Sequence, residues 1–168
     1  MNDLIKQILE IPEENQVIEF KRLNGNKVVA KIIQTIVSMT NTEGGTIIIG
    51  VDDPEKTILK GVDRIFGIEE NLELFDSVSE EIQKIVPPLS DICQPKKIHI
   101  DEINKTVALL YIPKATDNFR SINRKVYIRQ YKSNIELTPQ EVIKFAYAKG
   151  FEKADKELVD IDMELLNT

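Results

Sequence analysis

The chain has 168 residues, of which 42% are hydrophobic and 30% are charged, and its formal net charge is −6. These values predict one soluble globular domain, with or without an appendage, and argue against a protein that coats nucleic acid without specificity. One cysteine, Cys93, and one histidine, His99, give little material for a structural zinc site or a Cys–His catalytic pair. Because no apolar run reaches membrane-spanning length and the first residues lack a signal-peptide pattern, we expect a cytoplasmic protein without a membrane partner.

Apolar periodicity and turn residues predict an α+β fold, a mixed β-sheet flanked by helices. Thr138 and Glu141 have the spacing of a capping box, with Pro139 at the first helical position, and mark the start of a late helix. In chain order, the pattern predicts helices at residues 3–10, 27–40, 69–86 and 139–150, and strands at 16–21, 46–51, 58–62, 96–101, 106–112 and 125–131.

Helical spacing also assigns faces to the two long helices. In 27–40 the expected outer side chains are Lys27, Lys31, Gln34 and Ser38. In 69–86 the expected inner side chains are Leu72, Phe75, Val78, Ile82, Ile85 and Val86.

Residues 41–53 read as a helix end, a glycine turn, a buried strand and two carboxylates. Gly44 and Gly45 allow a sharp turn, and residues 46–51 form a β-branched apolar run typical of a strand covered on both faces. Asp52 and Asp53 follow where that strand ends. A rigid strand can hold carboxylates in place for a metal ion, although Asp-Asp-Pro can also form an ordinary solvated turn.

The strand at 16–21 carries the other candidate chemistry. Strand alternation places Glu19 and Lys21 on one face and Phe20 on the other. With Glu14 and Asp53, these residues resemble a carboxylate cluster that holds Mg²⁺ or Mn²⁺ for phosphodiester hydrolysis, with a lysine that stabilises the developing charge. A solvent-facing ion pair is the alternative interpretation of Glu-x-Lys on a strand.

Charge is unevenly distributed along the chain. Residues 93–132 hold nine basic and three acidic residues, whereas residues 151–168 hold six acidic and two basic residues. We therefore divide the chain into a domain at 1–150 and an acidic helix or tail at 151–168, which either docks on a partner or frays.

The strand at 125–131 is the candidate nucleic-acid interface. Alternation places Lys125, Tyr127, Arg129 and Tyr131 on one face, and basic groups interleaved with tyrosines suit a phosphate backbone with stacking bases. A half-buried strand with an ordinary polar face is the alternative. The full candidate set is Arg120, Arg124, Lys125, Tyr127, Arg129, Tyr131 and Lys132. No glycine-rich phosphate loop is present, so we expect no ATP.

Three stretches together resemble the Schlafen-type Alba-like domain, which also occurs in bacterial proteins described as divergent AAA or RecG-related regulators. They are residues 14–21 (Glu-Asn-Gln-Val-Ile-Glu-Phe-Lys), residues 36–53 with Asn-Thr-Glu-Gly-Gly and Gly-Val-Asp-Asp, and residues 126–129 (Val-Tyr-Ile-Arg). The match runs from about residue 14 to about residue 147. Asn15 departs from the family pattern, where serine is usual.

The resemblance implies a fold like one lobe of the Schlafen core and a metal-dependent endoribonuclease acting on structured RNA such as tRNA. The family's three acidic residues fall on Glu14, Glu19 and Asp53, which would hold Mg²⁺ or Mn²⁺, and Lys21 would assist. Because the Schlafen core pairs two lobes around RNA, we expect a homodimer or a separately encoded partner protein.

Two alternatives to the nuclease stay open. One is a non-catalytic DNA- or RNA-binding regulatory module in which the acidic residues are structural. The other is an interaction subunit of a larger assembly, such as one for anti-phage defence, that uses the acidic tail.

Overall fold

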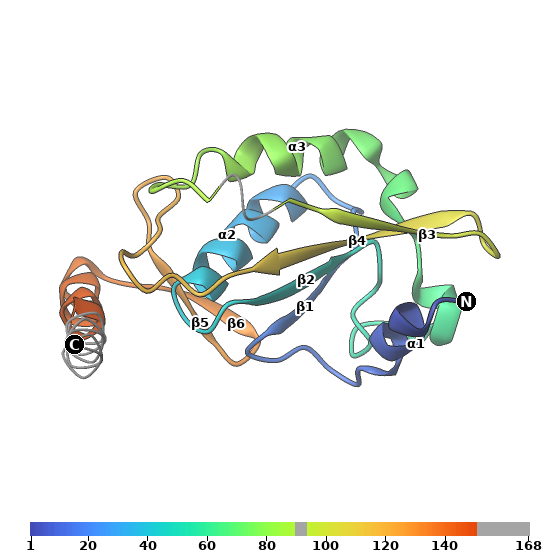
Figure 1. Ribbon diagram of the computed structural model, residues 1–168, viewed down its shortest axis with the longest axis horizontal. Coiled ribbons are helices and arrows are strands. Elements are labelled where there is room, and N and C mark those ends of the chain that lie inside the picture. Colours follow the sequence, from blue (N-terminus) through green and yellow to red (C-terminus); the bar gives the residue numbers. More distant parts are fainter. Residues whose placement is uncertain (90–93, 151–168) are drawn as a thin grey trace, which may run out of the picture.

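A four-stranded mixed sheet forms the centre of the fold (Figure 1), as predicted. The computed structural model describes residues 1–89 and 94–150. The strand order is β1-β2-β4-β3, with β1 parallel to β2 and the other pairs antiparallel. The sheet strands are β1 (Ile18–Lys21), β2 (Gly45–Ile49), β3 (Lys96–Ile100) and β4 (Lys105–Ile112).

Helices cover both faces of this sheet (Figure 1). Ile47 and Ile49 of β2 pack against α2 (Val28–Thr40) and α3 (Leu72–Ile82). Ile48 points to the opposite face, where it packs with side chains of α1 (Asp3–Glu10) and with Phe20 and Ile65. This burial on both sides confirms the prediction from the uninterrupted apolar run.

The glycine turn connects α2 to β2 as predicted. Gly44 has a φ of 73°, and a Cβ there would lie 2.6 Å from the Ile112 carbonyl oxygen. The Gly44 N–H donates to the Met39 carbonyl oxygen at 2.7 Å. The turn thus satisfies a carbonyl of the last helical turn and directs the chain into the sheet.

A second, two-stranded sheet lies against α2 (Figure 1). It consists of β5 (Tyr127–Gln130) and β6 (Ser133–Glu136), which pair antiparallel. The sequence analysis missed β6, because Ser-Asn-Ile-Glu has no apolar pattern. Residues 139–150 are helical, and Thr138 and Glu141 form the predicted reciprocal capping bonds.

Two predicted elements were wrong. Residues 58–62 form no strand; the chain there is irregular and continues into the 3-10 helix η1 (Gly61–Arg64), since β2 already has a neighbour on each side. The single helix at 69–86 is instead the 3-10 helix η2 (Ile68–Glu70) followed by α3. Asn71 separates η2 from α3, because its side chain accepts a hydrogen bond from the Leu74 N–H and so caps α3.

Three predicted side-chain positions also change. Leu72, assigned inward, is 53% exposed at the start of α3, and Val86 is 62% exposed beyond its end. Ser38, assigned outward, is buried, because the β5–β6 hairpin covers that side of α2 and Asn134 bonds to its hydroxyl. Cys93 and the acidic segment 151–168 lie outside the described residues. Within the described part of the chain, none of the helices combines the length and apolar character needed to span a membrane.

Candidate functional site

The predicted acidic residues meet at one edge of the sheet. β1 and β2 run parallel, with Lys21 opposite Ile49, so their carboxyl ends lie together. Asp53 follows β2 by four residues, and Glu14 precedes β1. We call Glu14, Glu19 and Asp53 the carboxylate cluster.

Glu14 is the most strongly perturbed member of the carboxylate cluster. It is 4% exposed, and its Oε2 accepts a hydrogen bond from the Phe20 N–H at 2.8 Å, on the free edge of β1. Burial, followed by the negative charge of Glu19, raises the pKa of Glu14 from 4.5 to about 7, and Asp53 acts in the same direction. The charges of Glu19 and Asp53 therefore both act on Glu14.

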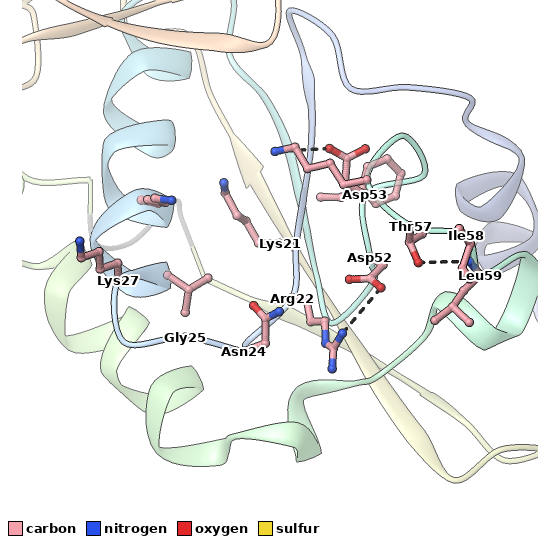
Figure 2. A pocket seen from close by; sticks show the side chains of 14 residues that line it. Lys21, Arg22, Asn24, Gly25, Lys27, Asp52, Asp53, Thr57, Ile58 and Leu59 are labelled. Carbon is pink, nitrogen blue, oxygen red and sulfur yellow. Dashed lines mark hydrogen bonds and ion pairs between the residues drawn. The ribbon is translucent and has the colours of Figure 1, made fainter.

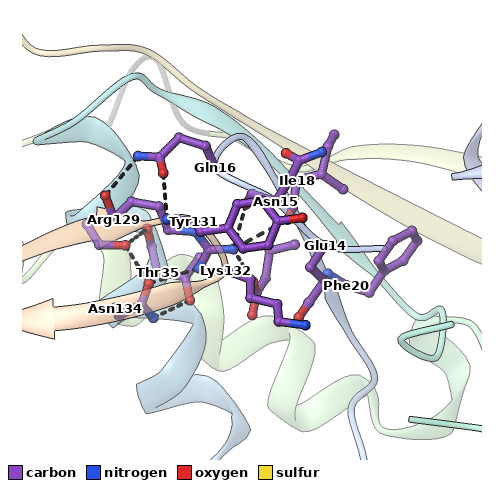
Figure 3. A network of polar contacts seen from close by, with 12 residues as sticks. Glu14, Asn15, Gln16, Ile18, Phe20, Thr35, Arg129, Tyr131, Lys132 and Asn134 are labelled. Atoms are coloured by element: carbon purple, nitrogen blue, oxygen red, sulfur yellow. Dashed lines mark hydrogen bonds and ion pairs between the residues drawn. The ribbon is translucent and has the colours of Figure 1, made fainter. Parts of the chain in front are cut away.

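Glu19 is held by two cations. One of them is Arg129, which Figure 3 shows beside Asn134. Lys21 Nζ lies 2.9 Å from Glu19 Oε1, and the Arg129 guanidinium donates to Glu19 Oε2. The Arg129 side chain is fully buried and also donates to Asn134 Oδ1 and to backbone carbonyl oxygens. The prediction that Glu19 and Lys21 share a face is confirmed, but this face is buried under the hairpin rather than open to solvent.

Asp53 has a local role as well as a place in the carboxylate cluster. Its Oδ1 accepts from the Glu55 N–H at 2.9 Å, and its Oδ2 lies 3.8 Å from Lys56 Nζ. The neighbouring Asp52 instead faces Arg22, at 3.7 Å. Asp53 thus shapes the turn, as the alternative interpretation expected, while its charge acts on Glu14.

The carboxylate cluster has the donor chemistry for a hard divalent cation, because all its candidate ligands are carboxylate oxygens. In residues 1–89 and 94–150, however, no three His, Cys, Asp or Glu side chains stand in the arrangement of a metal site. The current partners explain this: Glu14 faces the Phe20 amide, Glu19 faces two cations, and Asp53 faces a turn amide. A cation would require rotation of Asp53 and deprotonation of Glu14.

A cleft of about 630 Å³ opens beside the carboxylate cluster (Figure 2). Asp53 and Lys21 line it and connect it to the cluster. Five lining residues are basic, Lys21, Arg22, Lys27, Lys31 and Lys56, and two are acidic, Asp52 and Asp53. This cleft was not predicted from the sequence, because the cleft forms only where the loop after β2 lies opposite the start of α2. The lysines at the start of α2 were its one sequence signal.

Two central residues of the predicted basic strand are not exposed at the surface. Tyr127 and Arg129 do share a face, but that face is turned inward, and the residues are 8% and 3% exposed. The β5–β6 hairpin packs on α2, so Tyr127 joins the apolar core and Arg129 reaches Glu19. Tyr127 and Arg129 are therefore not exposed to nucleic acid, whereas Lys125 and Tyr131 of the same predicted face are exposed, and an interface there stays a prediction.

The other candidates of that set are divided between two places. Tyr131 and Lys132 lie beside the carboxylate cluster, where Tyr131 donates to Glu13 at 2.7 Å and Lys132 to Glu55 at 3.1 Å. The remaining candidates lie apart from it: Arg120 pairs with Asp117, Lys125 pairs with Glu136, and Arg124 is exposed. The structure does not gather the seven residues into one patch.

Comparison with known proteins gives a family and a fold. A family model described as Schlafen, AlbA_2 matches residues 14–138. The DIP2311 protein from Corynebacterium diphtheriae is 18% identical with a TM-score of 0.53, over 80% of this chain and 27% of that chain. The N-terminal domain of a RecG-related protein from Nitrosomonas europaea is 18% identical with a TM-score of 0.48, over 67% of this chain and 72% of that one. This chain thus spans about a quarter of the DIP2311 protein, and no curated protein sequence matches it.

Proposed function

This chain belongs to the Schlafen, AlbA_2 family, which indicates nucleic-acid binding, and on that premise we propose that it is a divalent-metal-dependent nuclease acting on RNA. One observation carries the proposal: the charges of Glu19 and Asp53 both act on the buried Glu14, and Asp53 lines a cleft in which basic residues outnumber acidic ones. The choice of RNA over DNA comes from the resemblance to the Schlafen core.

The cleft supplies the charge that a phosphate backbone requires. Lys27 and Lys31 are exposed, and in the described part of the chain no acidic side chain pairs with either. Lysines without acidic partners can contact a phosphate without first breaking an ion pair. The cleft therefore supports binding independently of any catalytic step.

The carboxylate cluster supplies the groups for hydrolysis. When bound, Mg²⁺ or Mn²⁺ would polarise the phosphate and lower the pKa of a water molecule. Glu14, Glu19 and Asp53 would hold it, with Glu19 kept in orientation by Arg129. Lys21 Nζ, at the border between the cluster and the cleft, would stabilise negative charge on the phosphate.

The sharpest test uses variants that keep the hydrogen bonds of the folded protein. Gln at position 14 still accepts from the Phe20 N–H, and Asn at position 53 still accepts from the Glu55 N–H. We expect total tRNA to be cut with Mn²⁺ or Mg²⁺ by the wild type, and at least about 100-fold more slowly by Glu14→Gln and Asp53→Asn. Asp52→Asn, next in sequence but facing Arg22, is the matched control and should cut at nearly the wild-type rate.

A second readout does not depend on activity. Mn²⁺ should raise the melting temperature of the wild type and of Asp52→Asn, but not that of Asp53→Asn, because a ligand stabilises only the state that binds it. Cutting that persists in both cluster variants, or in EDTA, would refute the proposal.

A non-catalytic binding module is the second candidate. The observation that favours it is that each cluster carboxylate already has a protein donor and that no ready-made metal arrangement stands among the described residues. It predicts salt-dependent binding of RNA or DNA, no cutting with any metal, and no loss of affinity in Asp53→Asn.

We also propose that the chain self-associates or binds a separate partner protein. Helix 139–150 exposes Ile143 and Tyr147, one turn apart, at 70% and 71%. Exposed apolar side chains at this spacing are common in protein interfaces. Light scattering should show a dimer; a monomer that also captures no partner would contradict this.

A further inference from the structure

The cleft has two unlike sides (Figure 2). Lys27 and Lys31 stand on one side, at the start of α2. Ile58 and Leu59 stand on the other, in the loop that follows β2. One side carries the two lysines, and the other carries two apolar side chains beside Asp52, Asp53 and Lys56.

The two lysines lie at a helix N-terminus, where a positive charge is unfavourable. Helix N-termini favour acidic residues, yet the first turn of α2 contains none, and Lys27 occupies the N-cap without a capping hydrogen bond from its side chain. Two lysines there repel the positive end of the helix dipole. An anion bound between them would remove this conflict.

The apolar side chain at the end of this loop is not packed in the core. Ile58 is 94% exposed, although Ile is among the residues most often buried. Polar contacts hold its loop instead: Asp53 accepts from the Glu55 N–H, Thr57 accepts from the Leu59 N–H at 3.1 Å, and Lys132 bonds to Glu55. The loop is therefore fixed around an apolar tip that faces solvent in the cleft.

We propose that this cleft binds one unpaired nucleotide, with its phosphate on Lys27 and Lys31 and the face of its base on Ile58. The inference deepens the proposed function by naming a single-stranded segment as the ligand. A base in a duplex is paired and stacked, so its face is not free to contact an apolar side chain. A single strand can turn a base out and keep its phosphate on the lysines.

Binding to three fluorescein-labelled 12-mers in EDTA tests this: a single-stranded RNA, its duplex, and a single-stranded oligomer of abasic sugar phosphates. We expect the RNA strand to bind more tightly than the duplex. Ile58→Ser should weaken binding of the RNA strand about fivefold and leave the abasic oligomer unchanged, because the lost contact is to a base. Leu72→Ser, which removes an exposed apolar side chain that does not line the cleft, is the control and should change neither.

The phosphate half of the inference has its own variant. Lys27→Gln combined with Lys31→Gln should weaken RNA and abasic binding alike and reduce the slope of log K against log salt by about 1.4, roughly 0.7 for each phosphate contact. Lys96→Gln, an exposed lysine outside the cleft, should leave the slope unchanged.

Three results would overturn the inference: duplex binding as tight as single-strand binding, equal effects of Ile58→Ser on the RNA and abasic oligomers, or no effect on either. Because EDTA removes any metal-dependent cutting, these results stand apart from the nuclease proposal. A protein that shows the Ile58 effect but never cuts RNA keeps this inference and refutes that one.

Discussion

Two basic regions of this molecule differ in their relation to the fold. Residues 120–132 contain five basic residues, and the cleft contains five. In the first region Arg129 is fully buried on Glu19, and Arg120, Lys125 and Lys132 each pair with an acidic residue. The cleft has paired cations as well, but Lys27 and Lys31 have no acidic partner in the described part of the chain. A local excess of basic residues thus does not show which cations are free to bind a ligand.

The chemistry of the two side chains explains this division. A buried cation must satisfy several donors at once, and the two Nη groups of Arg129 donate to Glu19, Asn134 and two backbone carbonyls, while its Nε has no hydrogen-bond partner. Lysine carries a compact, strongly hydrated charge, which suits an exposed position at a helix start. Arg129 therefore serves the structure, whereas Lys27 and Lys31 are accessible to the proposed ligand.

Replacing the buried cation should give the largest effect. Arg129→Met leaves Glu19 buried beside one cation instead of two, so we expect a loss of about 3–5 kcal/mol in the free energy of unfolding. Urea denaturation measures it. Arg124→Met, the same change at an exposed position, should stay within about 0.5 kcal/mol of the wild type.

A second variant checks the cause of that loss. Adding Glu19→Gln to Arg129→Met removes the buried charge of Glu19, which has lost one of its two cations. The double variant should recover part of the lost free energy of unfolding. If Arg129→Met alone unfolds in the same urea concentration as the wild type, the buried pair is not what holds the hairpin to β1.

Glu19 and Glu14 also differ in whether a cation pairs with the buried charge, with a smaller expected effect on stability. Glu19 has two cationic partners, whereas burial and the neighbouring acids raise the pKa of Glu14 to about 7. The folded state therefore holds the Glu14 proton more tightly than the unfolded state, whose pKa is near 4.5. The resulting stability is complete below about pH 4.5 and is lost as pH rises through about 7.

Glu14→Gln makes this pH dependence measurable in EDTA. Gln cannot ionise, so the variant should match the wild type near pH 5 and exceed its free energy of unfolding at pH 8 by about 1–2 kcal/mol, after allowance for solvent screening. Urea denaturation at both pH values measures the difference. Equal stability at pH 8 would show that Glu14 titrates normally.

Much of the fold could be predicted because local patterns decide it. The apolar run 46–51, the stripe along 27–40 and the glycine turn each contain their own explanation in sequence. Asn71 ends the helical pattern at 69–86 by capping α3, which is a local signal that the apolar periodicity outweighed. The other errors came where a distant segment decides, because the hairpin buries Ser38 and Arg129. The acidic residues were found through a family motif, whereas the cleft depends on a loop position that no local pattern contains.

The smallest expected effect on the free energy of unfolding comes from the two cleft lysines. Its sign should be opposite to that of Arg129→Met, so it contrasts the two regions most directly. Lys27→Gln with Lys31→Gln removes two cations from the positive end of α2, and Gln and Lys have similar helix propensities. We expect the free energy of unfolding to rise by about 0.3–1 kcal/mol for each lysine at low salt. Lys84→Gln, the same change just beyond the C-terminal end of α3, should lower it, because a cation there is favourable and pairs with Glu81. If the cleft variant is instead less stable, the lysines support the fold, and the argument that they are kept for a phosphate ligand loses its physical basis.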